Sequence, residues 1–261
     1  MKIGILSKRT QMITGKIKDY LEKKGHNVKI YSAENLCINE SLFENDFYIL
    51  KSKKLFYLYA GYFLEANNIP VIPTAEISHK HKYRIDAHFL IKEANLLAPK
   101  YYMGTQDTIK KNLKDEDYPL IVKPLMGSGS KGVKVIKSVN DLNFKDDQII
   151  FLEEFIEGSH YNVYFIDKQI CTLEKPPLTH EHVKMKLVPT PNDIREIILK
   201  WKKTHNLLFG HLDIVRENET DKIFIVDPGS FPEFTNWKCE GDPVQQICNL
   251  ILKKAKRIMS N

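Results

Sequence analysis

Residues 118–136, with the sequence YPLIVKPLMGSGSKGVKVI, decide the fold that we expect for this chain. The apolar run 120–122 is rich in β-branched residues and predicts a buried strand, which delivers Lys123 at its end. A segment rich in glycine and serine follows, made of Gly127, Ser128, Gly129, Ser130 and Gly132. Such a segment can turn successive backbone N–H groups toward one phosphate. The alternative is a glycine-rich hairpin turn beside a surface lysine.

The residues after Gly132 indicate which kind of phosphate loop this is. The Walker pattern GxxxxGK[ST] is absent, and the next residues, VKVI, read as a strand, whereas a Walker loop opens a helix. The order strand, lysine, loop, strand therefore predicts a different nucleotide-binding fold.

Length and composition indicate a globular protein. The 261 residues suffice for two or three small subdomains, and the 43% hydrophobic and 28% charged residues argue against a disordered tail. The beginning of the chain lacks the apolar core of a signal peptide, and no apolar run approaches the roughly 18 residues of a spanning helix, so we expect a cytoplasmic protein without a membrane partner. The net charge of +6 favours anionic partners, but no nucleic-acid-binding motif is present.

The order of the predicted elements divides the chain into three parts. Residues 1–74 read as a βαβ unit with a parallel, Rossmann-like sheet, which either binds an acceptor or only packs, since no GxGxxG is present. Residues 75–152 hold a helix that stops before Pro99, a second helix and the lysine hairpin, which we expect to act as a lid. Residues 153–261 hold the strands 161–167, 169–175, 211–216 and 222–227 and the helices 192–204 and 242–259.

Two aspartates stand at corresponding places of the last two predicted strands, HLDIVR and KIFIVD. In an antiparallel hairpin of this length, Asp213 and Asp227 can lie side by side on one face. A carboxylate within an apolar strand is costly unless a cation or hydrogen bonds compensate it, and magnesium bound by one or two carboxylates fits that requirement. The alternative is a pair of aspartates that bond to the backbone.

Together these features resemble the ATP-grasp superfamily over roughly residues 75–235. The resemblance implies an α/β (α+β) ATP-grasp fold with ATP and Mg²⁺ as cofactors. It also implies that Lys123 contacts the ATP phosphates, that the glycine loop closes over them, and that Arg84 replaces a second phosphate-binding lysine. Asp213 and Asp227 would be the magnesium ligands. The hinge that holds adenine would be formed by Glu153, Glu154, Phe155 and Ile156.

The sequence departs from the family pattern in two places. The family's last metal motif ends in asparagine, whereas DPGSFP places Gly229 at that position, which puts one magnesium ion in doubt. The glutamate that contacts ribose is also missing after the hinge, and His160 lies near its place.

Two branches of the superfamily compete for the activity. The lid KPLMGSGSKGV looks like that of RimK-type ligases, which phosphorylate a carboxylate and let an amine attack the acyl phosphate. The later strands look more like inositol 1,3,4-trisphosphate 5/6-kinases, which they match at Tyr164, Lys175, Pro176 and Leu178. We expect a kinase that phosphorylates a small anionic acceptor such as an inositol phosphate, with the ligase as the alternative and a silent nucleotide-binding module as the third possibility.

Both branches begin with transfer of the γ-phosphoryl group, for which the protein mainly positions the reactants and neutralises charge. We expect Lys123, Lys175 and His211 to be catalytic, with His211 near the acceptor. A polyphosphorylated acceptor would need several cations. The candidates are Lys80, Lys82, Lys175, His180, His182 and Lys184. For the segment THEHVKMK the alternative is a solvated loop.

Overall fold

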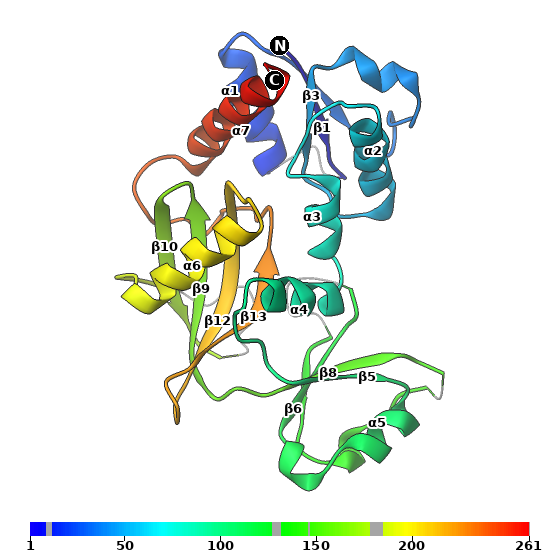
Figure 1. The fold of residues 1–261 in the computed structure, drawn as a ribbon, viewed down its shortest axis with the longest axis vertical. Helices are drawn as coiled ribbons and strands as arrows, with labels where there is room; N and C mark the ends of the chain where they lie inside the picture. The colour runs from blue at the N-terminus through cyan, green and yellow to red at the C-terminus, as the bar shows by residue number, and fades with distance from the viewer. Residues whose placement is uncertain (9–11, 127–131, 146, 178–184, 261) are drawn as a thin grey trace.

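Three β-sheets follow one another along the chain in the computed structural model, which describes residues 1–8, 12–126, 132–145, 147–177 and 185–260 (Figure 1). Among the helices of these residues, none has the length and apolar character needed to cross a membrane. The predicted α/β fold is confirmed, with one parallel sheet at the N-terminus and two antiparallel sheets after it.

The first sheet is parallel, as predicted, and its strand order is β2-β1-β3-β4. Its strands are β1 (Lys2–Leu6), β2 (Asn27–Tyr31), β3 (Phe47–Leu50) and β4 (Val71–Ile72), and its helices are α1 (Ile13–Lys23), the short 3₁₀ helix η1 (Glu40–Glu44) and α2 (Leu55–Ala66). Because parallel strands end at the same edge, the segment after β3 lies at the edge where α/β sheets commonly bind ligands.

The second sheet is antiparallel, with the order β5-β8-β6-β7. Its elements are β5 (Tyr101–Gly104), α5 (Gln106–Asn112), η2 (Asp115–Asp117), β6 (Leu120–Lys123), β7 (Lys134–Ile136), η3 (Val139–Asp141) and β8 (Ile150–Glu154). The expected lysine hairpin forms β6 and β7, and Lys123 is the last residue of β6. Gly132 has a φ of 76°, which favours glycine, whereas Gly127, Ser128, Gly129 and Ser130 lie outside the described residues.

The third sheet, with the order β11-β10-β9-β12-β13, carries the acidic strands. Its elements are β9 (Gly158–Ile166), β10 (Gln169–Lys175), β11 (Lys186–Val188), α6 (Asn192–Thr204), β12 (Phe209–Glu217), β13 (Ile223–Gly229) and the last helix α7 (Pro243–Met259). The expected boundary between residues 152 and 153 falls within β8, two residues before the chain leaves the second sheet.

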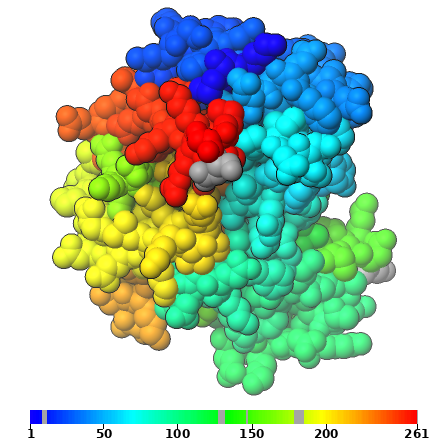
Figure 2. Space-filling view, turned by 45° about the horizontal axis from the view of Figure 1, so that its top comes forward, coloured from blue at the N-terminus to red at the C-terminus, as the bar shows by residue number. Residues whose placement is uncertain are grey.

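Hydrophobic cores lie on both faces of the third sheet. On one face, Tyr164 and Phe209 pack with α7 and with the N-terminal sheet in one continuous core. Figure 2 shows α7, in red, lying against the blue N-terminal part of the chain. On the other face, Val163 and Leu212 pack against Trp201 of α6 and against α4 (Arg84–Glu93). The third sheet is therefore held in place by helices from several parts of the chain.

The helix expected before Pro99 is α4, which ends at Glu93. A separate short helix, α3 (Ala75–Lys80), precedes it, and Tyr83 between the two has an extended backbone and pairs with Met126. Lys80 lies in the last turn of α3, where a positive charge stabilises the helix dipole. Arg84 alone begins α4.

Candidate active site

Lys123 lies between the second and the third sheet. Its side chain is 9% exposed, and its ammonium group forms an ion pair with the Glu153 carboxylate on the neighbouring strand β8. The same ammonium donates a hydrogen bond of 3.1 Å to the carbonyl oxygen of Val226 on β13. The expected phosphate-binding lysine therefore contacts the strand that carries Asp227.

Glu153 is a buried partner for two cationic or basic groups. Its other carboxylate oxygen lies 3.0 Å from His88 Nε2 on α4. Burial alone raises the pKa of Glu153, but the Lys123 ammonium and the hydrogen bonds from His88 and Lys123 outweigh this effect, so the pKa is lowered. The side chain of Glu153 thus compensates buried positive charge, which the sequence did not indicate.

The other hinge candidates lie where the chain passes from the second sheet to the third. Glu154 is exposed and accepts a hydrogen bond of 3.3 Å from the Lys100 backbone. Phe155 donates its backbone N–H to the Pro119 carbonyl at 3.1 Å, and Ile156 is buried. Their contact with adenine stays a prediction.

Asp213 and Asp227 lie directly opposite each other on β12 and β13, as the hairpin pattern suggested. Opposite residues of an antiparallel pair share a face, so their side chains are neighbours. Asp213 forms an ion pair of 3.0 Å with Lys175, and Asp227 forms one of 2.6 Å with Arg84. Each carboxylate therefore contacts a different cation.

The charge of Asp227 is stabilised by its surroundings. Burial raises the pKa of Asp227, but the guanidinium of Arg84 and the ammonium of Lys123 lower it by more, and the net shift is downward. Asp227 is consequently ionised at neutral pH, which is the state that binds a cation.

The acidic pair fits Mg²⁺, because adjacent carboxylates are ligands that this ion prefers. Asp213 Oδ1 is buried and has no hydrogen-bond partner among the described residues, so it can accept a metal bond. Within the same part of the chain, no group of three or more His, Cys, Asp and Glu side chains could hold a metal. Further ligands would therefore be amide, water or phosphate oxygens.

His211 and His160 lie on the strands β12 and β9 of the same sheet. Burial lowers the pKa of both, and for His160 the value falls to about 4, so both rings are neutral at pH 7. The ring of His211 lies opposite Gly229, where an added Cβ would approach its Cε1 to 2.0 Å. His211 therefore fills the space that the family's asparagine side chain would need.

The loop after β3 adds a cation that the sequence analysis missed. Lys53 donates to the His81 carbonyl at 3.2 Å, and burial lowers its pKa to about 8, although the charge of Asp227 opposes this shift. The available signal was the basic run KSKK at the carboxyl end of a parallel strand.

The cations expected to bind an acceptor are only partly brought to this site. Lys175 contacts Asp213, whereas Lys80 pairs with Glu76 at 3.1 Å and with Glu93 at 3.7 Å. The Lys82 ammonium lies 4.9 Å from the centre of the Tyr83 ring. His180, His182 and Lys184 lie outside the described residues.

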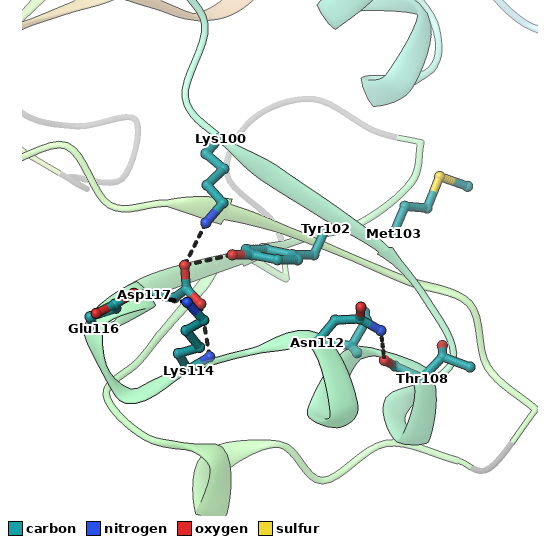
Figure 3. A pocket seen from close by; sticks show the side chains of 9 residues that line it. Lys100, Tyr102, Met103, Thr108, Asn112, Lys114, Glu116 and Asp117 are labelled. Atoms are coloured by element: carbon teal, nitrogen blue, oxygen red, sulfur yellow. Dashed lines mark hydrogen bonds and ion pairs between the residues drawn. The ribbon is translucent and has the colours of Figure 1, made fainter.

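A separate pocket of about 430 Å³ opens on the second sheet (Figure 3). Within it, Asp117 accepts hydrogen bonds of 2.6 Å from both Lys100 and Tyr102. None of the residues that line this pocket belongs to the ion pairs of Lys123, Arg84 or Lys175. The polar groups of the pocket therefore satisfy one another, away from the acidic pair.

Comparisons of the sequence and of the structure with known proteins lead to the same class of protein. The sequence model of an ATP-grasp domain family matches residues 81–192. A D-alanine–D-alanine ligase from Wolbachia is 30% identical over 102 residues, which is 36% of this chain and 32% of the ligase. A RimK-domain ATP-grasp protein from Sphaerobacter thermophilus superposes with a TM-score of 0.77 at 11% identity and covers 97% of this chain and 100% of its own. The D-alanine–D-alanine ligase from Bacillus anthracis in complex with ATP superposes with a TM-score of 0.73 at 15% identity. This superposition covers 99% of this chain and 98% of the ligase.

The family model identifies an ATP-grasp domain over residues 81–192, and the superpositions show that the chain has the ATP-grasp fold. The chain spans about a third of the length of the curated ligase that it matches. Its activity and its substrates are therefore proposals.

Proposed function

We propose that this protein is an ATP-dependent ligase that phosphorylates a carboxylate and then joins the resulting acyl phosphate to an amine. The observation that carries this proposal is the gathering of three cations around two adjacent carboxylates. Arg84 and Lys175 form ion pairs with Asp227 and Asp213. Lys123, which is paired with Glu153, donates a hydrogen bond to the Val226 carbonyl next to Asp227. A triphosphate with bound magnesium also combines negative and positive charges, so its phosphates can contact the cations and its magnesium can contact the carboxylates.

In the first step, a carboxylate oxygen of the acceptor attacks the γ-phosphorus of ATP, and ADP leaves. The cations Lys123, Arg84 and Lys175 would hold the phosphates and neutralise the charge that develops on them. When bound, Mg²⁺ would add positive charge at the phosphate oxygens, with Asp213 and Asp227 as its protein ligands. In the second step, the amine nitrogen attacks the acyl carbon, phosphate leaves, and the amine gives up a proton.

Two findings favour the ligase over the inositol phosphate kinase that we expected from the later strands. The relatives reported above are D-alanine–D-alanine ligases and a RimK-domain protein, and none of those three is an inositol kinase. In addition, Lys80 has its own acidic partners on α3 and α4, so it is a poor candidate for binding a polyphosphate. An acceptor with a single carboxylate requires fewer cations.

The test uses hydroxylamine as the amine, because it traps acyl phosphates as hydroxamates, which form coloured complexes with ferric iron. The protein is incubated with ATP, Mg²⁺ and pools of amino acids or other carboxylic acids, and ADP, phosphate and hydroxamate are measured. A ligase releases ADP and phosphate in equal amounts and forms hydroxamate only with its own carboxylate. Lys123→Ala serves as the inactive control.

ADP formation without phosphate, with the phosphoryl group found on an inositol phosphate, would establish the kinase instead. ATP binding without ADP formation from any acceptor would leave a silent nucleotide-binding module.

A further inference from the structure

Asn162 belongs to the same row of side chains as the two aspartates. On β9 it lies directly opposite Asp213 of β12, and Asp213 in turn lies opposite Asp227 of β13. Because directly opposite residues point to the same face of a sheet, the three side chains form one line across three strands.

Two oxygens in this row are buried without a partner. Asn162 is 8% exposed, and neither its Oδ1 nor Oδ1 of Asp213 has a hydrogen-bond partner among the described residues. Burial of an oxygen without a hydrogen-bond partner typically destabilises the fold by about 1–3 kcal/mol. Two such oxygens side by side therefore indicate that a ligand binds between them.

The chemistry of the two oxygens points to a cation as that ligand. The amide oxygen of Asn162 can only accept, and it lies on the strand position next to the Asp213 carboxylate. An oxygen beside a carboxylate attracts a positive charge.

The neighbouring pair of residues, His211 and Gly229, explains why the amide oxygen is supplied by Asn162 on β9. At position 229, where the family's asparagine would stand, any side chain would collide with His211, since an added Cβ would lie 2.0 Å from its Cε1. The amide oxygen missing on β13 is thus matched by one on the opposite side of Asp213.

We infer that Asn162 is a magnesium ligand of this protein, and that its amide oxygen with Asp213 Oδ1 holds the ion that Gly229 cannot help to bind. The inference rests on the proposed use of magnesium–nucleotide at this site. Carboxylate and amide oxygens are the protein ligands that Mg²⁺ accepts, and they leave its other positions to water and phosphate.

The test measures how strongly metal and nucleotide binding are coupled. The dissociation constant of ADP is determined by calorimetry with saturating Mg²⁺ and again with EDTA, and the ratio of the two is the coupling. Asn162→Leu should reduce this ratio about tenfold or more, since loss of a metal-site group commonly costs 10–100-fold in metal affinity. Its ADP affinity in EDTA should stay within about twofold of the unmodified protein.

Asn162→Asp supplies a second measurement that does not depend on the folding of the leucine variant. A charged oxygen at the same place should strengthen Mn²⁺ binding, followed by electron paramagnetic resonance, and should enlarge the rise in melting temperature that Mn²⁺ produces. Thr172→Val is the matched control. Thr172 is fully buried on the other face of the same sheet, where it lies 2.8 Å from the Thr190 hydroxyl, so its loss should leave the coupling unchanged.

Unchanged coupling in Asn162→Leu would overturn the inference, as would an equal loss of ADP affinity with and without metal. If the leucine variant does not fold, unchanged Mn²⁺ affinity in Asn162→Asp would overturn it. If the coupling between metal and ADP binding depends on Asn162 but the protein forms no hydroxamate, the inference is supported and the ligase activity is rejected. A protein that binds no ADP at all would reject both.

Discussion

The Lys123 ammonium donates a hydrogen bond of 3.1 Å to the carbonyl oxygen of Val226, the residue that precedes Asp227. This bond joins the end of β6 in the second sheet to β13 in the third. The proposed phosphate-binding cation Lys123 and the proposed metal ligand Asp227 are thereby held at one junction, although they lie far apart in the sequence.

Replacement of Glu153 by glutamine should destabilise the protein by about 3–5 kcal/mol, because the buried ammonium of Lys123 loses its counter-charge. Urea unfolding measures this change. Glu154→Gln, one residue further and exposed, should change the free energy of unfolding by less than about 0.5 kcal/mol. Since the folded pKa of Glu153 is lowered from 4.5, the difference between Glu153→Gln and the unmodified protein should shrink as the pH falls below that value. Equal effects of the two substitutions would contradict the assigned ion pair.

Asp213→Asn and Asp227→Asn should each slow ADP release by about 100-fold or more, because the Mg²⁺ site loses a charged ligand. The rate is measured over a series of Mg²⁺ concentrations, and more metal should be needed for half-maximal activity. Asp221→Asn in the turn between the same strands is the control, because its carboxylate pairs with Arg216 outside the acidic row. Activity of the two variants at the level of this control would exclude both aspartates as metal ligands.

Lys53→Met should stabilise the protein at pH 7 by about 1–3 kcal/mol, because burial of the charged lysine opposes folding. The sign follows from its pKa, which falls from 10.5 in the unfolded chain to about 8 in the fold. The cost is complete below pH 8 and disappears as the pH rises toward 10.5, so the gain should vanish over that interval. Thermal unfolding at several pH values measures it, with the exposed Lys54→Met as control. A gain that does not vary with pH would mean that Lys53 keeps its ordinary pKa.

Gly229→Asn, which restores the residue usual in the family, should destabilise the protein by about 1–3 kcal/mol, because the new side chain collides with His211. His211→Ala should relieve the collision, so the double variant should lose less than the sum of the two single variants. A coupling of about 0.5–3 kcal/mol in the double-mutant cycle is expected, and additive losses would show that the two positions do not compete for space.

The sequence predicted most of the fold because its strongest patterns are local. The lysine hairpin, the two acidic strands and the helix α6 depend on periodicity and turn residues within short windows. The strand β5 was missed, because its residues Tyr101 and Met103 are exposed at the edge of the sheet and lack the pattern of a buried strand.

The site was predicted in its charged residues but not in their pairing. The run IIFLEEF indicates an acidic strand end, yet it does not tell which glutamate turns inward to meet Lys123. Asn162 and Lys53 carry no motif of their own. They became candidates only when strand register and the approach of the N-terminal loop placed them beside the aspartates.

A crystal structure of the protein with AMP-PNP and Mn²⁺, in which anomalous scattering locates the metal, would show directly whether Lys123 and the two aspartates bind one nucleotide. We expect Mn²⁺ on Asp213 and Asp227, with the β- and γ-phosphates between these carboxylates and the Lys123 ammonium. A nucleotide bound elsewhere, for example in the pocket beside Lys100 and Asp117, with no metal on the two aspartates, would contradict it.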